Sequence, residues 1–206
     1  MKPIAFACGL ALLGACASVP IGEPPTLSQR DLDEIYAVLK RDFHARGIAT
    51  MSRIEPDRTQ RTCNLYRDHP PADLAKPLEE EQLKDIPFPA GLMGDWKRGQ
   101  KIAESGVGLQ WSDRPGSPTG GSCYNCHQLS PQQESHGTLG PSLRAFGKVR
   151  GSGPQTQRYA YGKIYNAKAY NLCSQMPRMG LSGTLSEEQI KDLVAYLLDP
   201  GSPVNR

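Results

Sequence analysis

The chain has 206 residues, of which 38% are hydrophobic and 22% are charged, and its formal net charge is +3. This length leaves room for one or two domains around a core that is not rich in apolar side chains. The 21 Gly and 18 Pro predict that much of the chain is loop between short helices. No segment after residue 16 is apolar enough to cross a membrane, so the mature domain is expected to be soluble.

The first sixteen residues have the pattern of an export signal. Lys2 supplies the positive start, residues 4–15 form an apolar run too short for a lasting membrane span, and Leu13-Gly14-Ala15-Cys16 ends it. The last four residues resemble the bacterial lipobox, in which the Cys is lipidated and becomes the first mature residue. We therefore expect a signal over 1–16, lipidation at Cys16 and a periplasmic location, either free or lipid-anchored. Ordinary cleavage after Ala15 or Ala17 is the alternative.

Residues 17–90 are predicted to form a loop-rich N-terminal extension. They carry 10 basic and 13 acidic side chains, whereas residues 91–206 carry 13 and 8. Ser28 can cap a helix that Gly47 ends, with an apolar face formed by Leu32, Ile35, Tyr36, Leu39 and Phe43. Residues 48–90 hold six prolines and are expected to be mostly loop, with a short helix at 78–85. No catalytic set is visible in this part.

Cys123-Tyr124-Asn125-Cys126-His127 is the C-x-x-C-H signature of covalent haem attachment. Thiols three residues apart on one turn face the same way and can meet the two vinyl groups of one porphyrin, and the following His can ligate the iron. A redox dithiol would require a surrounding βαβ pattern, which is absent. A zinc site would require two more ligands at comparable spacing. The motif therefore predicts one covalent haem c in a domain spanning residues 91–206.

Export also affects the remaining cysteines. Cys8 leaves with the signal, and Cys63 and Cys173 are left over once Cys16, Cys123 and Cys126 are assigned. Two leftover thiols tend to pair in an oxidising compartment, so a Cys63–Cys173 disulfide is expected, with two buried free thiols as the alternative.

Two helices frame the haem motif. Asp95 can cap a helix to about Ser105, and Ser186 with Gln189 forms a capping box for a terminal helix that ends before Pro200. This order of helix, C-x-x-C-H, loop and terminal helix resembles the class I cytochrome c family, which implies an all-α fold. In that family a Gly of the first helix packs against an aromatic of the last, and Gly99 and Tyr196 are the candidates.

The same resemblance suggests the second iron ligand and the support of the first. Met176, followed by Pro177, resembles the Met-Pro ligand loop, with Met179 as the fallback. His136 is only nine residues beyond His127, which is short for reaching the opposite haem face. Pro141, in Gly-Pro-Ser-Leu, is expected to accept a hydrogen bond from the His127 ring through its carbonyl. With both axial positions filled, the haem would transfer electrons rather than bind a small molecule.

The segment from 135 to 186 has no acidic residue and seven basic ones: Arg144, Lys148, Arg150, Arg158, Lys163, Lys168 and Arg178. Lying between the two expected ligands, they could rim the haem crevice, hold haem propionates or steer an acidic partner. A solvated face is the alternative. Nucleic acid is not an expected partner in this compartment.

Several segments of residues 91–206 together resemble the SoxX family, the mono-haem subunits of SoxAX cytochromes. They are Gly140–Leu143, Met176–Gly180, Leu185–Ile190, Val194–Leu197 and the tail Gly201–Asn205. The resemblance implies a SoxA-like cytochrome partner and a SoxYZ-like carrier, whose cysteine is joined oxidatively to thiosulfate. The chain would then be the non-catalytic, electron-accepting subunit of an L-cysteine S-thiosulfotransferase. A free-standing periplasmic electron carrier is the alternative.

Overall fold

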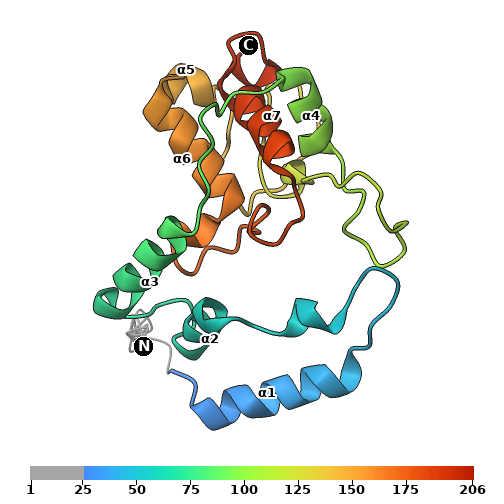
Figure 1. The fold of residues 1–206 in the computed structure, drawn as a ribbon, viewed down its shortest axis with the longest axis vertical. Coiled ribbons are helices and arrows are strands. Elements are labelled where there is room, and N and C mark those ends of the chain that lie inside the picture. The colour runs from blue at the N-terminus through green and yellow to red at the C-terminus, as the bar shows by residue number, and fades with distance from the viewer. Residues whose placement is uncertain (1–25) are drawn as a thin grey trace, which may run out of the picture.

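The computed structural model describes residues 26–206, so the predicted signal and Cys16 lie outside the described residues. The described part is built of helices joined by long loops, and its only extended pairing is an isolated bridge between Arg46 and Ala49 (Figure 1). The all-α class expected from the sequence is confirmed.

Helices α4 (Trp96–Glu104) and α7 (Glu187–Leu198) cross at the centre of the upper part of the molecule (Figure 1). Their approach is close because Gly99 has no side chain at the crossing. A Cβ at Gly99 would lie 2.0 Å from the backbone oxygen of Asp192 and 2.8 Å from Cβ of Tyr196. The glycine and the tyrosine picked from the sequence therefore do meet across the two helices.

Both predicted caps of these helices are present. The carboxylate of Asp95 accepts hydrogen bonds from the backbone N–H groups of Lys97 and Arg98. Ser186 and Gln189 form the reciprocal capping box at the start of α7. A third contact, which the sequence did not indicate, locks the crossing: Asp192 is buried and accepts two hydrogen bonds from the Arg98 guanidinium, both 2.7 Å.

The main core is completed by α5 (Phe146–Arg150) and α6 (Pro154–Tyr165), which lie beside α7 (Figure 1). Tyr161 of α6 and Ile190 and Val194 of α7 are fully buried there. Burial of an Ile or Val side chain stabilises the fold by about 1.5–3 kcal/mol, whereas the buried Tyr161 hydroxyl has no hydrogen-bond partner among the described residues. Helix α6 was not predicted, because it has no side-chain cap and begins directly at Pro154.

The C-terminal tail closes this core. Asn205, in the short 3₁₀ helix η4 (Pro203–Asn205), donates to the backbone oxygens of Leu197 and Asp199 and accepts from the N–H of Gly147. One amide side chain thereby satisfies the last carbonyls of α7 and the first turn of α5. Ser202 adds a hydrogen bond to the oxygen of Tyr196. The tail segment singled out from the sequence thus has a structural role.

The extension contains more helix than predicted. It holds α1 (Gln29–Asp42), a 3₁₀ helix η1 (Met51–Ile54), α2 (Arg58–Leu65) and α3 (Ala72–Lys84). Ser28 caps α1 as expected, but α1 ends at Asp42 rather than near Gly47, which has a positive φ of 53° in the following turn. The short helix expected at 78–85 begins six residues earlier and includes Pro77.

The extension has only a small core of its own. Cys63, Leu78 and Leu172 are buried together, and Leu172 comes from the far part of the chain, beyond the 3₁₀ helix η3 (Ala167–Ala169). Of the predicted apolar face of α1, only Leu32 is buried, while Ile35 is 45% exposed. The extension is attached to the haem domain through α2, α3 and the chain beyond η3. Ile86 is also buried in the main core, and Arg46 lies 3.3 Å from the centre of the Trp111 ring.

Candidate haem site

The C-x-x-C-H segment forms a tight turn, with the 3₁₀ helix η2 at Cys123–Asn125. The oxygen of Cys123 accepts hydrogen bonds from the N–H groups of Cys126 and His127, at 3.1 and 2.9 Å. Both cysteines and the histidine are half-buried. The two cysteines and the histidine therefore lie on one short hydrogen-bonded turn.

Both thiols of the turn are free in the structure. Burial raises the pKa of the Cys123 thiol to about 11, so it is protonated at neutral pH. A redox-active cysteine requires the opposite shift, because the thiolate is the nucleophile. Cys123 therefore does not have the lowered pKa of a redox nucleophile.

The proximal histidine is oriented by the Gly-Pro-Ser-Leu segment. The Nδ1 atom of His127 lies 2.7 Å from the backbone oxygen of Pro141. Because a carbonyl oxygen only accepts, Nδ1 must carry the proton, which leaves the lone pair of Nε2 available to a metal. Gly140 packs on the ring so closely that a Cβ there would lie 2.2 Å from Cε1 of His127. This segment thus fixes both the tautomer and the ring position.

These residues fit haem c. Two free thiols on one turn can form the thioether bonds, and an imidazole with an available Nε2 can ligate the iron. When bound, the haem supplies an iron that takes up and releases one electron. The contribution of the chain is to hold that iron, to set its ligands and to limit its contact with water.

The two candidate methionines occupy different environments. Met179 is 8% exposed in the main core, and its backbone is fixed by hydrogen bonds to Ile164 at 3.2 Å and Leu185 at 3.0 Å. Met176 is half-buried and packs against the edge of the same core, as Cys123 does. Release of Met179 to an iron would open the core, whereas Met176 is partly accessible. His136, the third candidate, has its Nδ1 3.0 Å from the backbone oxygen of Gly137.

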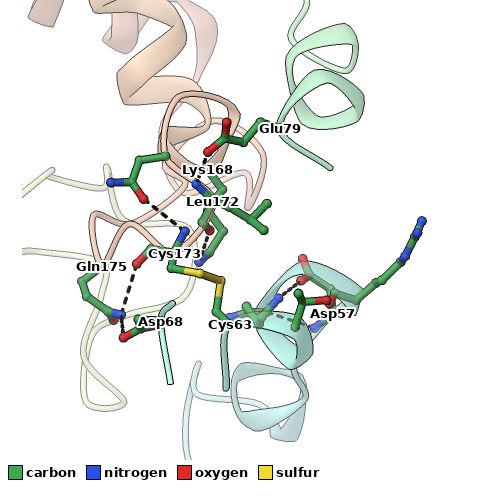
Figure 2. Close-up of a disulfide and its surroundings, with 12 residues drawn as sticks. Asp57, Cys63, Asp68, Glu79, Lys168, Leu172, Cys173 and Gln175 are labelled. Carbon is green, nitrogen blue, oxygen red and sulfur yellow. Dashed lines mark hydrogen bonds between the residues drawn. A yellow bond between two sulfur atoms is a disulfide. The ribbon is translucent and has the colours of Figure 1, made fainter. Parts of the chain in front are cut away.

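Cys63 and Cys173 form a disulfide in the structure (Figure 2). Around it lie polar residues that the sequence did not single out: Asp57, Gln60 and Asp68. Burial raises the pKa of Asp57, but the N–H of Gln60 and the guanidinium of Arg178 outweigh it and hold that pKa below its ordinary value. The spacing of Asp57 and Gln60 is that of a capping box and could have revealed α2.

Most of the basic run is engaged inside the chain. The guanidinium of Arg158 lies 3.5 Å from the centre of the Phe88 ring, a cation–π contact. Lys168 is buried, donates to the oxygen of Leu172 at 3.0 Å, and has its pKa lowered by that burial. Arg178 pairs with Asp57. Arg150 and Lys163 lie over aromatic rings. Arg144, Lys148, Arg150 and Arg158 are nevertheless exposed, so part of the run remains on the surface.

Within residues 26–206 no helix combines the length and the hydropathy that a membrane crossing requires.

Residues 97–199 match the family Cytochrome c. A protein of Aquifex aeolicus (strain VF5) named an uncharacterized lipoprotein is 34% identical over 155 residues, which is 73% of each chain. The crystal structure of SoxXA from P. pantotrophus matches with 23% identity and a TM-score of 0.40, over 57% of this chain and 95% of that one. At that level the structural likeness assigns no function. The family match, the attachment turn and the oriented histidine agree: the chain belongs to the cytochrome c family and carries covalent haem c for electron transfer.

Proposed function

We propose that the chain is the electron-accepting, mono-haem subunit of a thiosulfate-oxidising complex, similar to SoxX. The observation that carries the electron-transfer part is the His127–Pro141 contact, which leaves Nε2 free to ligate the iron of a haem whose porphyrin Cys123 and Cys126 would attach. The observation that carries the SoxX part is the sequence resemblance of five segments, ending in the Ser202–Asn205 tail.

In the proposed reaction, one sulfur–sulfur bond forms between thiosulfate and a cysteine of a SoxYZ-like carrier. The thiol proton leaves and two electrons are released, one at a time, to haems. The conjugating chemistry belongs to a SoxA-like partner, and this chain takes up electrons and passes them on. The name of the Aquifex relative supports the proposal that Cys16 is lipidated and that the subunit is held at a membrane in the periplasm.

We further propose Met176 as the distal ligand. Thioether ligation would raise the reduction potential relative to bis-histidine ligation and leave no open position on the iron. The matched test compares Met176→Ala with Met179→Ala. The first should abolish the far-red charge-transfer band of the sulfur–iron bond. The second should keep that band but lower stability by about 2–5 kcal/mol, as core truncations do. A Met176→Ala protein with an unchanged spectrum would refute the assignment.

The function is tested by native purification from the bacterium that makes the protein, followed by counting haems and subunits. The proposal predicts a second c-type cytochrome in stoichiometric amount. Thiosulfate should reduce the haem of this chain only when that partner and the carrier are present. A monomer that exchanges electrons with several proteins and never with thiosulfate would instead identify a free-standing carrier. A colourless protein, made in a host that matures such cytochromes, would contradict both.

A further inference from the structure

The loop that contains Met176, residues 173–179, is attached on both sides of the methionine to the N-terminal extension. Three residues before Met176, Cys173 forms the disulfide with Cys63 of α2. One residue before it, Gln175 donates to Asp68 at 3.1 Å, as Figure 2 shows. Two residues after it, Arg178 donates to Asp57 and, at 3.2 Å, to Gln60. The extension thus contacts this methionine loop at three places.

The loop has few other attachments. No helix is present between η3 and α7, and the N–H of Met176 bonds only to the neighbouring Ser174 hydroxyl at 3.3 Å. Within residues 26–206, the side chains of Gln175 and Arg178 hydrogen-bond outside the segment only to the extension, while the N–H of Cys173 donates to the nearby Asn171 side chain. Met179, by contrast, is tied by its backbone to Ile164 and Leu185. Neighbouring methionines are therefore held by different parts of the molecule.

The part of the extension that holds the loop is itself well fixed. Asp57 caps α2, and the side-chain oxygen of Gln60 accepts a hydrogen bond from the N–H of Asp57 at 3.0 Å. Cys63 is 3% exposed and packs with Leu78 of α3. The carboxylate of Glu79 in α3 accepts a hydrogen bond from the N–H of Leu172 at 2.8 Å. Helices α2 and α3 are thus both bonded to the chain at Leu172 and Cys173, where the methionine loop begins.

We propose that Asp57, Arg178 and the Cys63–Cys173 disulfide are positioning residues for Met176, so that the extension serves as a clamp on the distal-ligand loop. The inference rests on Met176 being the iron ligand. A mobile loop must lose conformational entropy to present its sulfur, and a loop already held in place loses less. An apparent affinity falls with the fraction of the competent conformer, so loosening the clamp should weaken the sulfur–iron bond.

The test uses the ferric, haem-loaded full chain and adds imidazole, which competes with the methionine sulfur for the iron. Asp57→Asn keeps the cap of α2 but removes the charge, and Arg178→Leu removes the other partner. The Asp57 side chain is 44% exposed and that of Arg178 16%, and we take for this pair the surface value of about 0.2–1 kcal/mol. Each variant should therefore bind imidazole up to about fivefold more tightly than the wild type. Cys63→Ser/Cys173→Ser removes the covalent link three residues before Met176 and should increase the affinity by more than either single variant, that is, by more than about fivefold.

Arg58→Gln is the matched control. It also removes an ion pair of α2, to Glu81, but that pair is exposed and does not touch the methionine loop. Its imidazole affinity should equal that of the wild type.

Equal imidazole affinity in wild type, Asp57→Asn and Arg178→Leu would overturn the clamp, even where the double cysteine variant fails to mature. An increase of the same size in Arg58→Gln would also overturn it, because the effect would then follow from general destabilisation. An unchanged spectrum in Met176→Ala would remove both the ligand and the clamp. Failure to find a cytochrome partner would refute only the proposed complex, since the imidazole measurement needs this chain alone.

Discussion

The close approach of α4 and α7 can be tested by adding one methyl group at Gly99. In Gly99→Ala the new Cβ would lie 2.0 Å from the backbone oxygen of Asp192, well inside contact distance. Overpacking of this kind costs about 1–3 kcal/mol, and we take the upper end because a helix backbone cannot rotate away as a side chain can. Alanine gains about 1 kcal/mol over glycine inside a helix. The net loss is therefore about 2 kcal/mol.

For a chain of this size that loss lowers the unfolding temperature by about 4–8 °C. Thermal unfolding of the haem-loaded protein, followed by far-ultraviolet circular dichroism, measures it. Gly91→Ala is the control, because no atom lies within 4 Å of a Cβ built there and its φ is not positive. A Gly99→Ala protein that unfolds at or above the wild-type temperature would show that the helices do not depend on this approach.

Three further changes test the site and its frame. Gly140→Ala should push the His127 ring off its position, which would be seen as loss of the low-spin haem spectrum at normal haem content; an unchanged spectrum would contradict the packing. Asp192→Asn should lower the free energy of unfolding by about 1–2 kcal/mol in denaturant titration, because it weakens part-buried bonds to the charged Arg98; a loss below about 0.5 kcal/mol would argue against that role. The pKa of Asp95 lies below its ordinary value because the N–H groups at the start of α4, that of Arg98 first, stabilise its carboxylate. The stabilisation from this charge is therefore present above the ordinary pKa of about 3.9 and is lost as the pH falls through the lowered one. The stability difference between wild type and Asp95→Asn should narrow over that acid range, and a constant difference would refute it.

Local sequence signals predicted the parts of the fold that depend on neighbours in the chain. The haem turn, the Asp95 cap and the Ser186–Gln189 box all involve residues at most four positions apart, so their chemistry can be read directly. Prediction failed where the signal was missed or absent. The capping box of α2 was present but overlooked, and α6 offers no side-chain cap at all.

The basic run shows the limit of reading charge from sequence. Its lack of acidic residues suggested an open surface, but the partners of Arg158, Lys168 and Arg178 come from elsewhere in the fold or from the backbone. An aromatic ring or a backbone carbonyl can bind a cation but carries no formal charge, so it does not enter a count of charged residues. A net balance therefore could not show that these cations are already engaged.

By itself, the sequence determined the covalent cofactor and the all-α class and pointed to His127 as the expected ligand, because each follows from residue types at short fixed spacing. The tertiary structure decided what holds the methionine loop. Arg178 meets Asp57 across 121 positions and Gln175 meets Asp68 across 107. No local propensity connects residues so far apart; only the packing of α2 and α3 against the chain beyond η3 brings them together.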